Sequence, residues 1–321
     1  MNHISRIGRL LVVPLALTAA LTVAAPGVAD AAPGISTAKL RFGIVNEGGP
    51  LAGAELDRIA TQAGEAPSVV MTYQDFRSQP PISQLDAVAA RGATTMITWE
   101  PWAWGGGTVQ PDFRTDRITA GAFDAYIRSW GTALARWGKP VMLRFGHEMN
   151  ANWYPWADGV NGNGAGDYVA AYRRVHDVLR SAGAANVSFV WGPNVPDYGM
   201  TPLKGLYPGS SYVDQVSLDG YNWGTTQSWS SWQSASAIYA TGISQMRNIA
   251  PGKRIIVAEV SSAEAGGSKS TWIKDAISYF AAKPDISAVV WFNLNKEQDW
   301  RFDSTAASAT AFRDALARRP R

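Results

Sequence analysis

The sequence predicts one α/β domain, a (β/α)8 barrel, in the part of the chain that follows an N-terminal leader. Two observations carry this prediction: eight short runs rich in Val, Ile and Leu, and amphipathic helical stretches between them. Near-continuous apolar runs are typical of parallel strands covered on both faces. Strands that alternate with helices in this way close into a barrel of about 250 residues. A chain of 321 residues has room for one such domain.

An open, doubly wound sheet is the alternative arrangement of the same elements. Such a sheet usually carries a glycine-rich fingerprint directly after its first strand, where a dinucleotide phosphate binds. Here the first apolar run is followed by Asn46-Glu47-Gly48-Gly49-Pro50, which does not match that fingerprint. The barrel is therefore the favoured architecture.

The apolar runs and the helical periodicity give expected bounds for each element. Strands are expected at residues 40–45, 68–73, 94–99, 141–145, 187–191, 215–218, 255–258 and 288–292. Helices are expected at residues 52–63, 82–90, 123–137, 168–179, 235–249, 272–282 and 306–317. Asp167 is placed as an N-cap, and Pro251-Gly252 ends a helix. The connection between the fifth and sixth strands has a weak helical pattern and is predicted to be mostly loop. The glycine-rich segment 159–166 is predicted to be a mobile loop beyond the fourth strand.

Residues 1–31 are expected to be a secretory signal peptide, and the barrel domain is expected over residues 38–320. Arg6 and Arg9 precede an apolar run, and a small-residue cleavage pattern ends at Ala31. A transmembrane anchor is less favoured, because the run is short for a bilayer and contains proline. The mature protein is therefore expected to be secreted and free of the membrane.

Composition excludes several classes of function. The formal net charge of +3 is too small and too scattered for a nucleic-acid footprint, and the absence of cysteine excludes disulfides and thiolate metal sites. His147-Glu148 begins like the zinc motif HExxH, but the position of the second histidine is Ala151. No G-x-S-x-G nucleophile motif is present. We therefore expect no metal and no cofactor.

Two glutamates follow apolar strands on opposite sides of the expected barrel. Glu148 comes after the fourth strand and Glu259 after the seventh. Active sites of such barrels lie at the C-terminal ends of the strands, so both side chains can point at one bond. Hydrolysis of a glycosidic bond with retention of configuration uses two carboxyl groups about 5–5.5 Å apart, one as acid/base and one as nucleophile.

The two roles require different environments, because the acid must hold a proton that the nucleophile lacks. Glu148 lies beside Trp153, which suits a raised pKa. Glu259 requires a hydrogen-bond donor, and Tyr221 is well placed to be one. Arg144 shares the inward face of its strand with Glu148, so it is either a donor in the site or a core ion-pair partner. A salt bridge or a helix cap would explain either glutamate alone, but the pair favours catalysis.

Aromatic residues are numerous, with 14 Trp and 11 Tyr. Four tryptophans lie at or beside strand ends and are candidates to stack on sugar rings: Trp153, Trp156, Trp223 and Trp291. Trp130, Trp137 and Trp272 lie within helices and are interpreted as packing residues. Trp99, Trp102, Trp104 and Trp300 stay open between core and substrate contact. Glu100 is either an acceptor for a sugar hydroxyl or the partner of a neighbouring arginine.

The motif RFGHEMNANWYPW at residues 144–156 resembles the acid/base strand of glycoside hydrolase family 26, where a Trp-rich loop follows His-Glu-Met-Asn. VSLDGYNWG, IIVAEVSSAE and AVVWFNL resemble that family's sixth, seventh and eighth strand ends, in the same order. The resemblance implies a retaining endo-β-glycanase with Glu148 as acid/base and Glu259 as nucleophile. It also implies that His147 hydrogen-bonds the substrate or a carboxylate, and that Tyr221 holds Glu259. The loop Trp153-Tyr154-Pro155-Trp156 is more similar to the family's mixed-linkage glucanase-like members than to its β-mannanases.

Taken together, these patterns predict a secreted, metal-independent endo-β-glycanase that acts on β-1,4-mannan or mixed-linkage β-1,3-1,4-glucan. Its expected partner is the polysaccharide substrate, with no nucleic acid and no membrane, and a monomer is expected. A non-hydrolytic carbohydrate-binding barrel is the alternative from another class. A hydrolase for a bacterium's own exopolysaccharide is a further alternative, because no separate module for binding plant material is visible.

Overall fold

The structure, a computed structural model, describes residues 39–320 and shows a closed barrel of eight parallel strands in sequence order. The strands are β1 Arg41–Asn46, β2 Val69–Asp75, β3 Thr94–Glu100, β4 Val141–Phe145, β5 Val187–Trp191, β6 Gln215–Asn222, β7 Arg254–Ser262 and β8 Ile286–Asn293. Strand β8 pairs with β1 and closes the barrel. The (β/α)8 fold predicted from the sequence is therefore confirmed.

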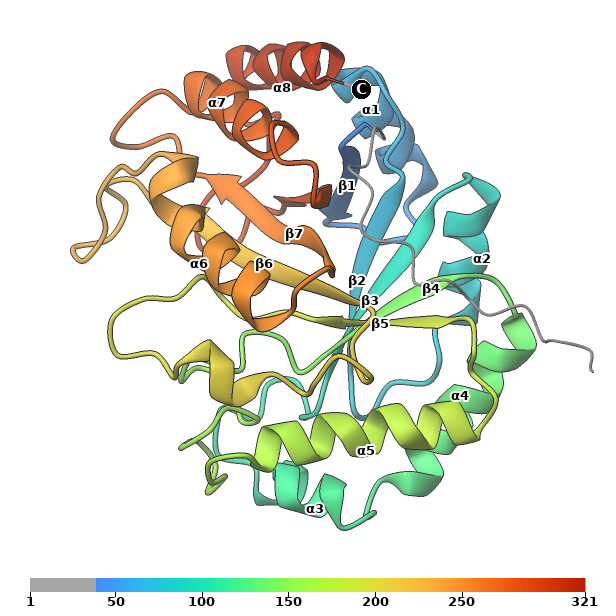
Figure 1. Cartoon of the computed structure of the whole chain (residues 1–321). Coiled ribbons are helices and arrows are strands. Elements are labelled where there is room, and N and C mark those ends of the chain that lie inside the picture. Colours follow the sequence, from blue (N-terminus) through green and yellow to red (C-terminus); the bar gives the residue numbers. More distant parts are fainter. Residues whose placement is uncertain (1–38, 321) are drawn as a thin grey trace, which may run out of the picture. The chain divides into compact units, whose positions relative to one another are not determined.

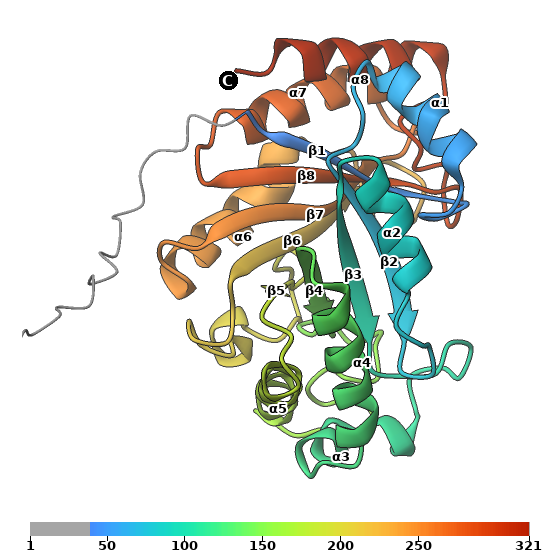
Figure 2. The same cartoon turned by 90° about the vertical axis from the view of Figure 1, so that its right-hand side faces the viewer.

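Helices surround the strands, as Figure 1 and Figure 2 show. They are α1 Gly53–Ala63, α2 Ile82–Ala90, α3 Thr115–Thr119, α4 Asp124–Trp137, α5 Asp167–Ser181, α6 Ala235–Ile249, α7 Lys269–Ala281 and α8 Ala306–Arg318. Two short 3-10 helices, η1 Pro111–Phe113 and η2 Leu203–Leu206, lie in connecting loops. The connection from β5 to β6 holds only η2, so the prediction of a mostly irregular crossover is confirmed.

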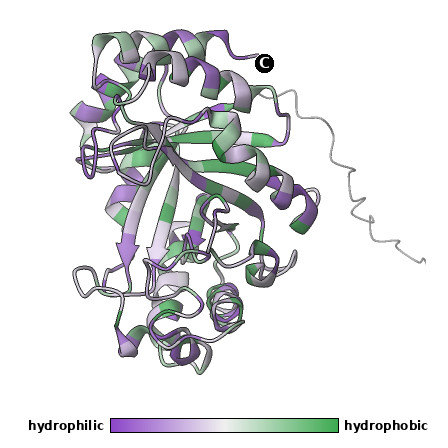
Figure 3. Ribbon diagram, turned by 90° about the vertical axis from the view of Figure 1, so that its left-hand side faces the viewer, coloured by the Kyte–Doolittle hydropathy of each residue, from purple (hydrophilic) through white to green (hydrophobic). Residues whose placement is uncertain are grey.

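Alternation along the strands separates two apolar cores. In β4, Val141, Leu143 and Phe145 belong to the core between strands and helices, whereas Met142 belongs to the core inside the barrel. The same parity places Arg144 inside the barrel, where it is fully buried. Hydrophobic stretches along the strands are visible in green in Figure 3. The barrel interior is thus apolar toward the N-terminal ends of the strands and becomes polar toward their C-terminal ends.

Strands β6 and β7 extend four residues beyond their predicted ends at residues 218 and 258. Tyr221 and Glu259 therefore lie within strands, where Asp219 pairs with Glu259 and Tyr221 pairs with Ser261. The polarity of these segments hid them from a search for apolar runs. The ladder also shifts its register between Leu218 and Asp219.

Two local predictions need correction. Helix α5 begins at Asp167 itself, with Gly166 as its N-cap, and the Asp167 carboxylate accepts a hydrogen bond from the backbone N–H of Gly164 at 2.7 Å. The glycine-rich loop 159–166 was predicted to be mobile from its composition. Its Asn163 side chain is instead buried, accepts from Thr115 and donates to two backbone carbonyls, so the loop is tied to its surroundings.

The expected signal peptide and its cleavage after Ala31 lie outside the described residues, as does residue 38, the expected first residue of the barrel domain. Within residues 39–320, no helix combines the length and the apolar character that a membrane crossing requires.

Candidate active site

Glu259 lies in β7 and receives three hydrogen bonds from three other strands. The Tyr73 hydroxyl of β2 donates to Oε1 at 2.7 Å, and Arg144 Nη2 of β4 donates to the same oxygen at 2.5 Å. The Tyr221 hydroxyl of β6 donates to the other oxygen, Oε2. Burial and the nearby Glu259 charge raise the pKa of both tyrosines well above the usual range, so both stay protonated donors. Three donors, one of them cationic, suit an ionised carboxylate.

Arg144 connects four strands inside the barrel. It donates from Nε to the Thr98 hydroxyl at 3.0 Å, from Nη2 to Glu259, and from Nη1 to Asp219. Burial lowers its pKa, but the charges of Asp219 and Glu259 outweigh burial and hold the guanidinium charged. The bond to Glu259 fits the predicted role of Arg144 as a donor in the site. Its further assignment as a residue that binds substrate is contradicted, because the side chain has no exposed surface. Inward strand parity predicted its position, but the surrounding carboxylates occupy its donors.

Glu148 lies three residues beyond β4 on a sharply turned backbone. Its own φ is +52°, in the left-handed region that non-glycine residues rarely adopt, and Gly146 has the same φ. The backbone N–H of Glu148 donates to the Gly192 carbonyl at 2.8 Å. Such backbone strain clusters at functional sites, where the surrounding structure holds a side chain in one position.

The Glu148 carboxylate has only neutral hydrogen-bond partners. Asn194 Nδ2 donates to one oxygen and Trp153 Nε1 to the other, each at 2.7 Å. Burial, and secondarily the negative charge of Glu259, raises the pKa of Glu148 to about 7, although both hydrogen bonds lower it. Glu148 therefore keeps a proton at pH values where an ordinary glutamate has lost it.

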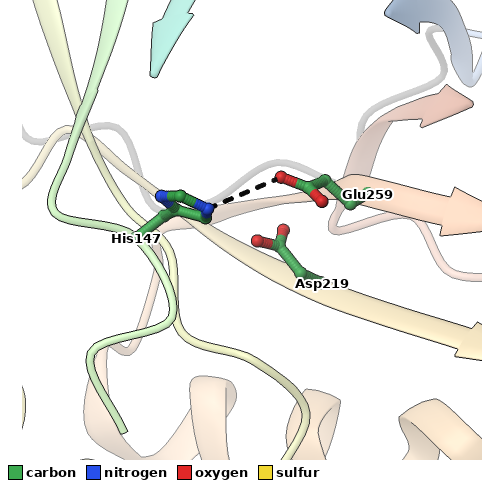
Figure 4. Close-up of side chains that lie close together, drawn as sticks. All are labelled: His147, Asp219 and Glu259. Atoms are coloured by element: carbon green, nitrogen blue, oxygen red, sulfur yellow. Dashed lines mark ion pairs between the residues drawn. The ribbon is translucent and has the colours of Figure 1, made fainter. Parts of the chain in front are cut away.

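His147 lies between two carboxylates and is buried. Its Nδ1 is 3.8 Å from Glu100 Oε1, and its Nε2 is 4.0 Å from Glu259 Oε1, as Figure 4 shows for Glu259. Burial, followed by the charge of Arg144, lowers the pKa of His147 well below its usual value, so the ring is neutral. Its Nδ1 has no hydrogen-bond partner. A neutral imidazole with an unused nitrogen keeps one hydrogen-bonding position, and its bond to the substrate stays a prediction.

His147, Asp219 and Glu259 offer ligand atoms within 4.8 Å of one another, a spacing that could hold a metal ion (Figure 4). The guanidinium of Arg144, however, already bonds both carboxylates. A second cation there would face a fixed positive charge in a buried setting, which is unfavourable. A metal-independent site therefore stays our prediction.

Glu100, at the end of β3, is buried and accepts hydrogen bonds from two indoles. Trp102 Nε1 donates at 3.0 Å and Trp104 Nε1 at 2.5 Å, both to Oε2. Burial raises the pKa of Glu100 to about 7, against the effect of these two bonds. Its closest basic side chain is His147, which is neutral, so the suggested arginine ion pair is wrong.

The four tryptophans proposed as sugar platforms divide into two groups. Trp153 is 42% exposed, and Trp223 is half-buried with its edge against Trp300 at 4.8 Å between ring centroids. Trp156 and Trp291 are buried, so their assignment as stacking platforms is wrong. Trp156 donates to the His147 carbonyl, and Trp291 faces the helices and donates to the Trp300 carbonyl. A position at a strand end does not reveal which face of the strand a ring occupies.

Three residues with clear contacts in the site received no role from the sequence: Tyr73, Asn194 and Asp219. Each lies near the C-terminal end of a strand: Tyr73 in β2, Asn194 after β5 and Asp219 in β6. Tyr73 donates to Glu259, Asn194 to Glu148, and Asp219 accepts from Arg144. Their strand-end position was the available signal, and pairing them with a specific partner required the barrel geometry.

The fold and the site together define a class of protein. A (β/α)8 barrel carries one buried glutamate in the turn after β4 and another within β7, close enough for the charge of Glu259 to raise the pKa of Glu148. This arrangement is that of the glycoside hydrolases.

Comparison with known proteins specifies the family. Residues 118–262, which include both glutamates, match the family described as glycosyl hydrolase family 26. Endoglucanase H of Acetivibrio thermocellus is 42% identical over 236 residues, which are 72% of this chain and 25% of that protein. A mannan endo-1,4-beta-mannosidase of Bacillus subtilis is 33% identical over 97 residues, 28% of this chain and 26% of that protein. The chain belongs to glycosyl hydrolase family 26.

The solved structures agree on the fold. The catalytic domain of the family 26 endo-β-1,4-mannanase of Bacillus sp. JAMB-750 superimposes with a TM-score of 0.66 at 18% identity, covering 87% of this chain and 86% of that one. A Cellulomonas fimi endo-β-1,4-mannanase gives a TM-score of 0.65 at 18% identity, covering 88% and 72%. Both curated relatives named above are longer, and this chain matches about a quarter of each.

Proposed function

We propose that this protein is a secreted endo-β-glycanase that cleaves internal β-glycosidic bonds with retention of configuration. The supporting observation is the contrast between the two glutamates. Glu148 is buried among neutral donors with a pKa raised to about 7, whereas Glu259 receives a guanidinium and two phenolic hydroxyls. One carboxyl group is thus suited to give a proton and the other to attack.

The reaction follows from these environments. Glu148 protonates the departing glycosidic oxygen while Glu259 attacks the anomeric carbon and forms a covalent glycosyl-enzyme. Tyr73, Tyr221 and Arg144 hold the Glu259 carboxylate in one orientation for that attack. The deprotonated Glu148 then accepts a proton from water, which attacks the same carbon and releases the sugar.

The substrate proposed is β-1,4-mannan or mixed-linkage β-1,3-1,4-glucan of the plant cell wall. One curated relative is named an endoglucanase and others are named mannan endo-1,4-beta-mannosidases. The match to the endoglucanase is longer and has the higher identity. The loop Trp153-Tyr154-Pro155-Trp156 likewise favours the glucan as substrate. We further propose that the enzyme acts as a monomer outside the cell.

The test replaces each glutamate separately. Glu259→Ala is expected to abolish turnover even of an activated aryl β-glycoside. Glu148→Ala is expected to slow substrates with poor leaving groups most, and azide should restore its rate by replacing the attacking water. Glu47→Ala is the matched control, because Glu47 also ends a strand but is exposed and contacts only the backbone of Asn295.

Products distinguish the remaining alternatives. The proton NMR spectrum at early times should show the anomer with the configuration of the cleaved bond, and an inverted product would exclude the mechanism. Binding of polysaccharide without release of reducing sugar would favour a non-hydrolytic barrel. Rates on mannan, mixed-linkage glucan and β-1,3-xylan, measured side by side, decide the substrate.

A further inference from the structure

Within residues 39–320, the large apolar side chains that are exposed all lie in loops that follow barrel strands. They are Leu51, Trp104, Val109, Trp153, Tyr198 and Trp229. These loops emerge after β1, β3, β4, β5 and β6, at the C-terminal end where the two glutamates lie. Exposed apolar residues scattered singly need no explanation, but their restriction to one end of a domain indicates a binding surface.

Trp104 differs from an ordinary exposed aromatic residue because it is held at two points. Its side chain is 51% exposed, yet its indole N–H donates to the buried Glu100 carboxylate at 2.5 Å. Its backbone N–H donates to Asp75 Oδ2 at 3.2 Å. Tyr198 is fully exposed on the same end of the barrel, and its hydroxyl has no bond to the protein.

The anchor of Trp104 is itself part of the wall of the site. Glu100 also accepts from Trp102, whose ring packs edge-on against Tyr154 and Trp156 with centroid separations of 5.6 Å. Those two rings contact His147. The orientation of the Trp104 ring is thus fixed by a chain of contacts that leads back to the catalytic centre.

We propose that Trp104 is a sugar-binding platform of the polysaccharide, away from the bond that is cleaved, and that Glu100 is its positioning residue. This inference rests on the proposed function, because it assigns a part of the polymer to this surface. A fixed, half-exposed indole offers a flat apolar face to the C–H face of a β-linked pyranose. Fixing the ring in advance removes the entropy cost that a free side chain would incur on binding.

In this assignment Glu100 does not touch the sugar. Both indole bonds go to Oε2, and the carboxylate is buried. The ionised form accepts both bonds, and protonation, at a pKa raised to about 7 by burial, weakens them. Weaker anchoring of Trp104 should therefore accompany a fall in pH through neutrality.

The experiment compares the polymer with a short aryl β-glycoside, which occupies only the positions next to the cleaved bond. Trp104→Ala is expected to raise KM for the polymer about three- to tenfold, the range of a lost aromatic contact, and to change kcat much less. Trp104→Ala should raise KM for the short substrate less than it raises KM for the polymer. Glu100→Gln should raise the polymer KM in the same direction, and the double variant should be no worse than Trp104→Ala alone, because both act through one ring. Trp137→Ala is the matched control, because the Trp137 indole also donates to a carboxylate, that of Asp86, but lies at the C-terminal end of helix α4, just before strand β4. This variant should leave the polymer KM unchanged.

Three results would overturn the inference. An equal rise in KM for Trp137→Ala would show that the loss of any anchored indole, and not of Trp104 in particular, weakens binding. A Glu100→Gln variant that loses kcat equally on both substrates would place Glu100 at the reacting atoms. Additive effects in the double variant would separate the two residues.

A binding measurement separates this inference from the proposed hydrolysis. Affinity electrophoresis in gels containing mannan or mixed-linkage glucan measures binding of the inactive Glu259→Ala protein with and without Trp104→Ala. If retardation of the Glu259→Ala protein depends on Trp104 but the wild-type protein releases no reducing sugar, the platform is supported and the proposed hydrolysis is refuted. Retardation that is absent, or equal with and without Trp104, refutes the platform whatever the activity.

Discussion

The hydrogen bond from Trp153 to Glu148 predicts a measurable change in pH dependence. Trp153→Phe removes the indole N–H but keeps an aromatic ring beside the carboxyl group. That bond stabilises the ionised form of Glu148, so its loss should raise the pKa of Glu148 above the value of about 7 that burial produces. A hydrogen bond to a charged group contributes about 1.5–3 kcal/mol, and one pKa unit corresponds to about 1.36 kcal/mol. Because Trp153 is 42% exposed, water replaces part of the bond, and we expect a rise of about one unit or less.

The assay is the pH profile of kcat/KM on the polysaccharide. Glu148 must be protonated to act as the acid, so the rate should fall on the alkaline side as Glu148 loses its proton. In Trp153→Phe this alkaline limb should move to higher pH. Below the limb, the variant should lose rate by a constant factor, since ring contacts change but the proton is present in both proteins.

Trp104→Phe is the control for this assay, because Glu100 also has a pKa of about 7. It removes a donor to Glu100 and leaves both donors of Glu148 in place. The alkaline limb should therefore stay at its wild-type position. If the limb moves in Trp104→Phe and not in Trp153→Phe, the titrating group is Glu100 and our assignment of the acid is refuted. An alkaline limb that moves to lower pH in Trp153→Phe would contradict the direction of the effect.

Three further predictions use the same network. Tyr73→Phe and Tyr221→Phe each remove one donor to the buried Glu259 and should lower kcat/KM about 10- to 100-fold and the unfolding free energy by about 1–3 kcal/mol, measured by steady-state kinetics and calorimetry. Arg144→Met should cost about 3–5 kcal/mol of unfolding free energy in denaturant titration, because it leaves buried carboxylates unpaired, and a loss below about 1 kcal/mol would contradict this. Glu148→Gln should gain stability relative to wild type as pH rises. The folded pKa of Glu148 is raised from 4.5 to about 7, so wild type loses up to about 3 kcal/mol across that interval while the neutral variant does not. A difference in melting temperature that stays constant from pH 4.5 to 8 would refute it.

The fold was predictable because each element carries its own signal. Eight buried strands read as apolar runs, and the bounds expected for β4 and β5 agree with the structure. The signal failed where function changes the composition. The C-terminal halves of β6 and β7 carry Asp219, Tyr221 and Glu259, so their strand structure rests on backbone pairing that apolar patterning does not register. The five residues of α3 are too few to show helical periodicity.

The site was predictable as a set of strand ends but not as a set of contacts. Glu148 and Glu259 stand out because they follow apolar runs on opposite sides of the barrel, and not because they are carboxylates at strand ends, since Glu47 and Glu100 are as well. The side of the strand on which an aromatic ring lies was not predictable, as Trp291 shows. Its neighbours on β8 alternate between the two cores, so one step along the strand moves a side chain from the barrel interior to the side facing the helices. Trp156 lies in a loop, where no periodicity exists to predict its burial.

Charge balance explains why the proton resides on Glu148. Arg144 carries one positive charge and contacts two carboxylates, Asp219 and Glu259, so it can neutralise only one of them. His147 is neutral and adds no further positive charge. An ionised Glu148 would therefore enter a buried site in which two carboxylates already share the single cation, and Glu148 has only the amide of Asn194 and an indole as partners. Strand parity places Arg144 inside the barrel and the turn after β4 places Glu148, but the assignment of acid and nucleophile follows from where the single guanidinium points.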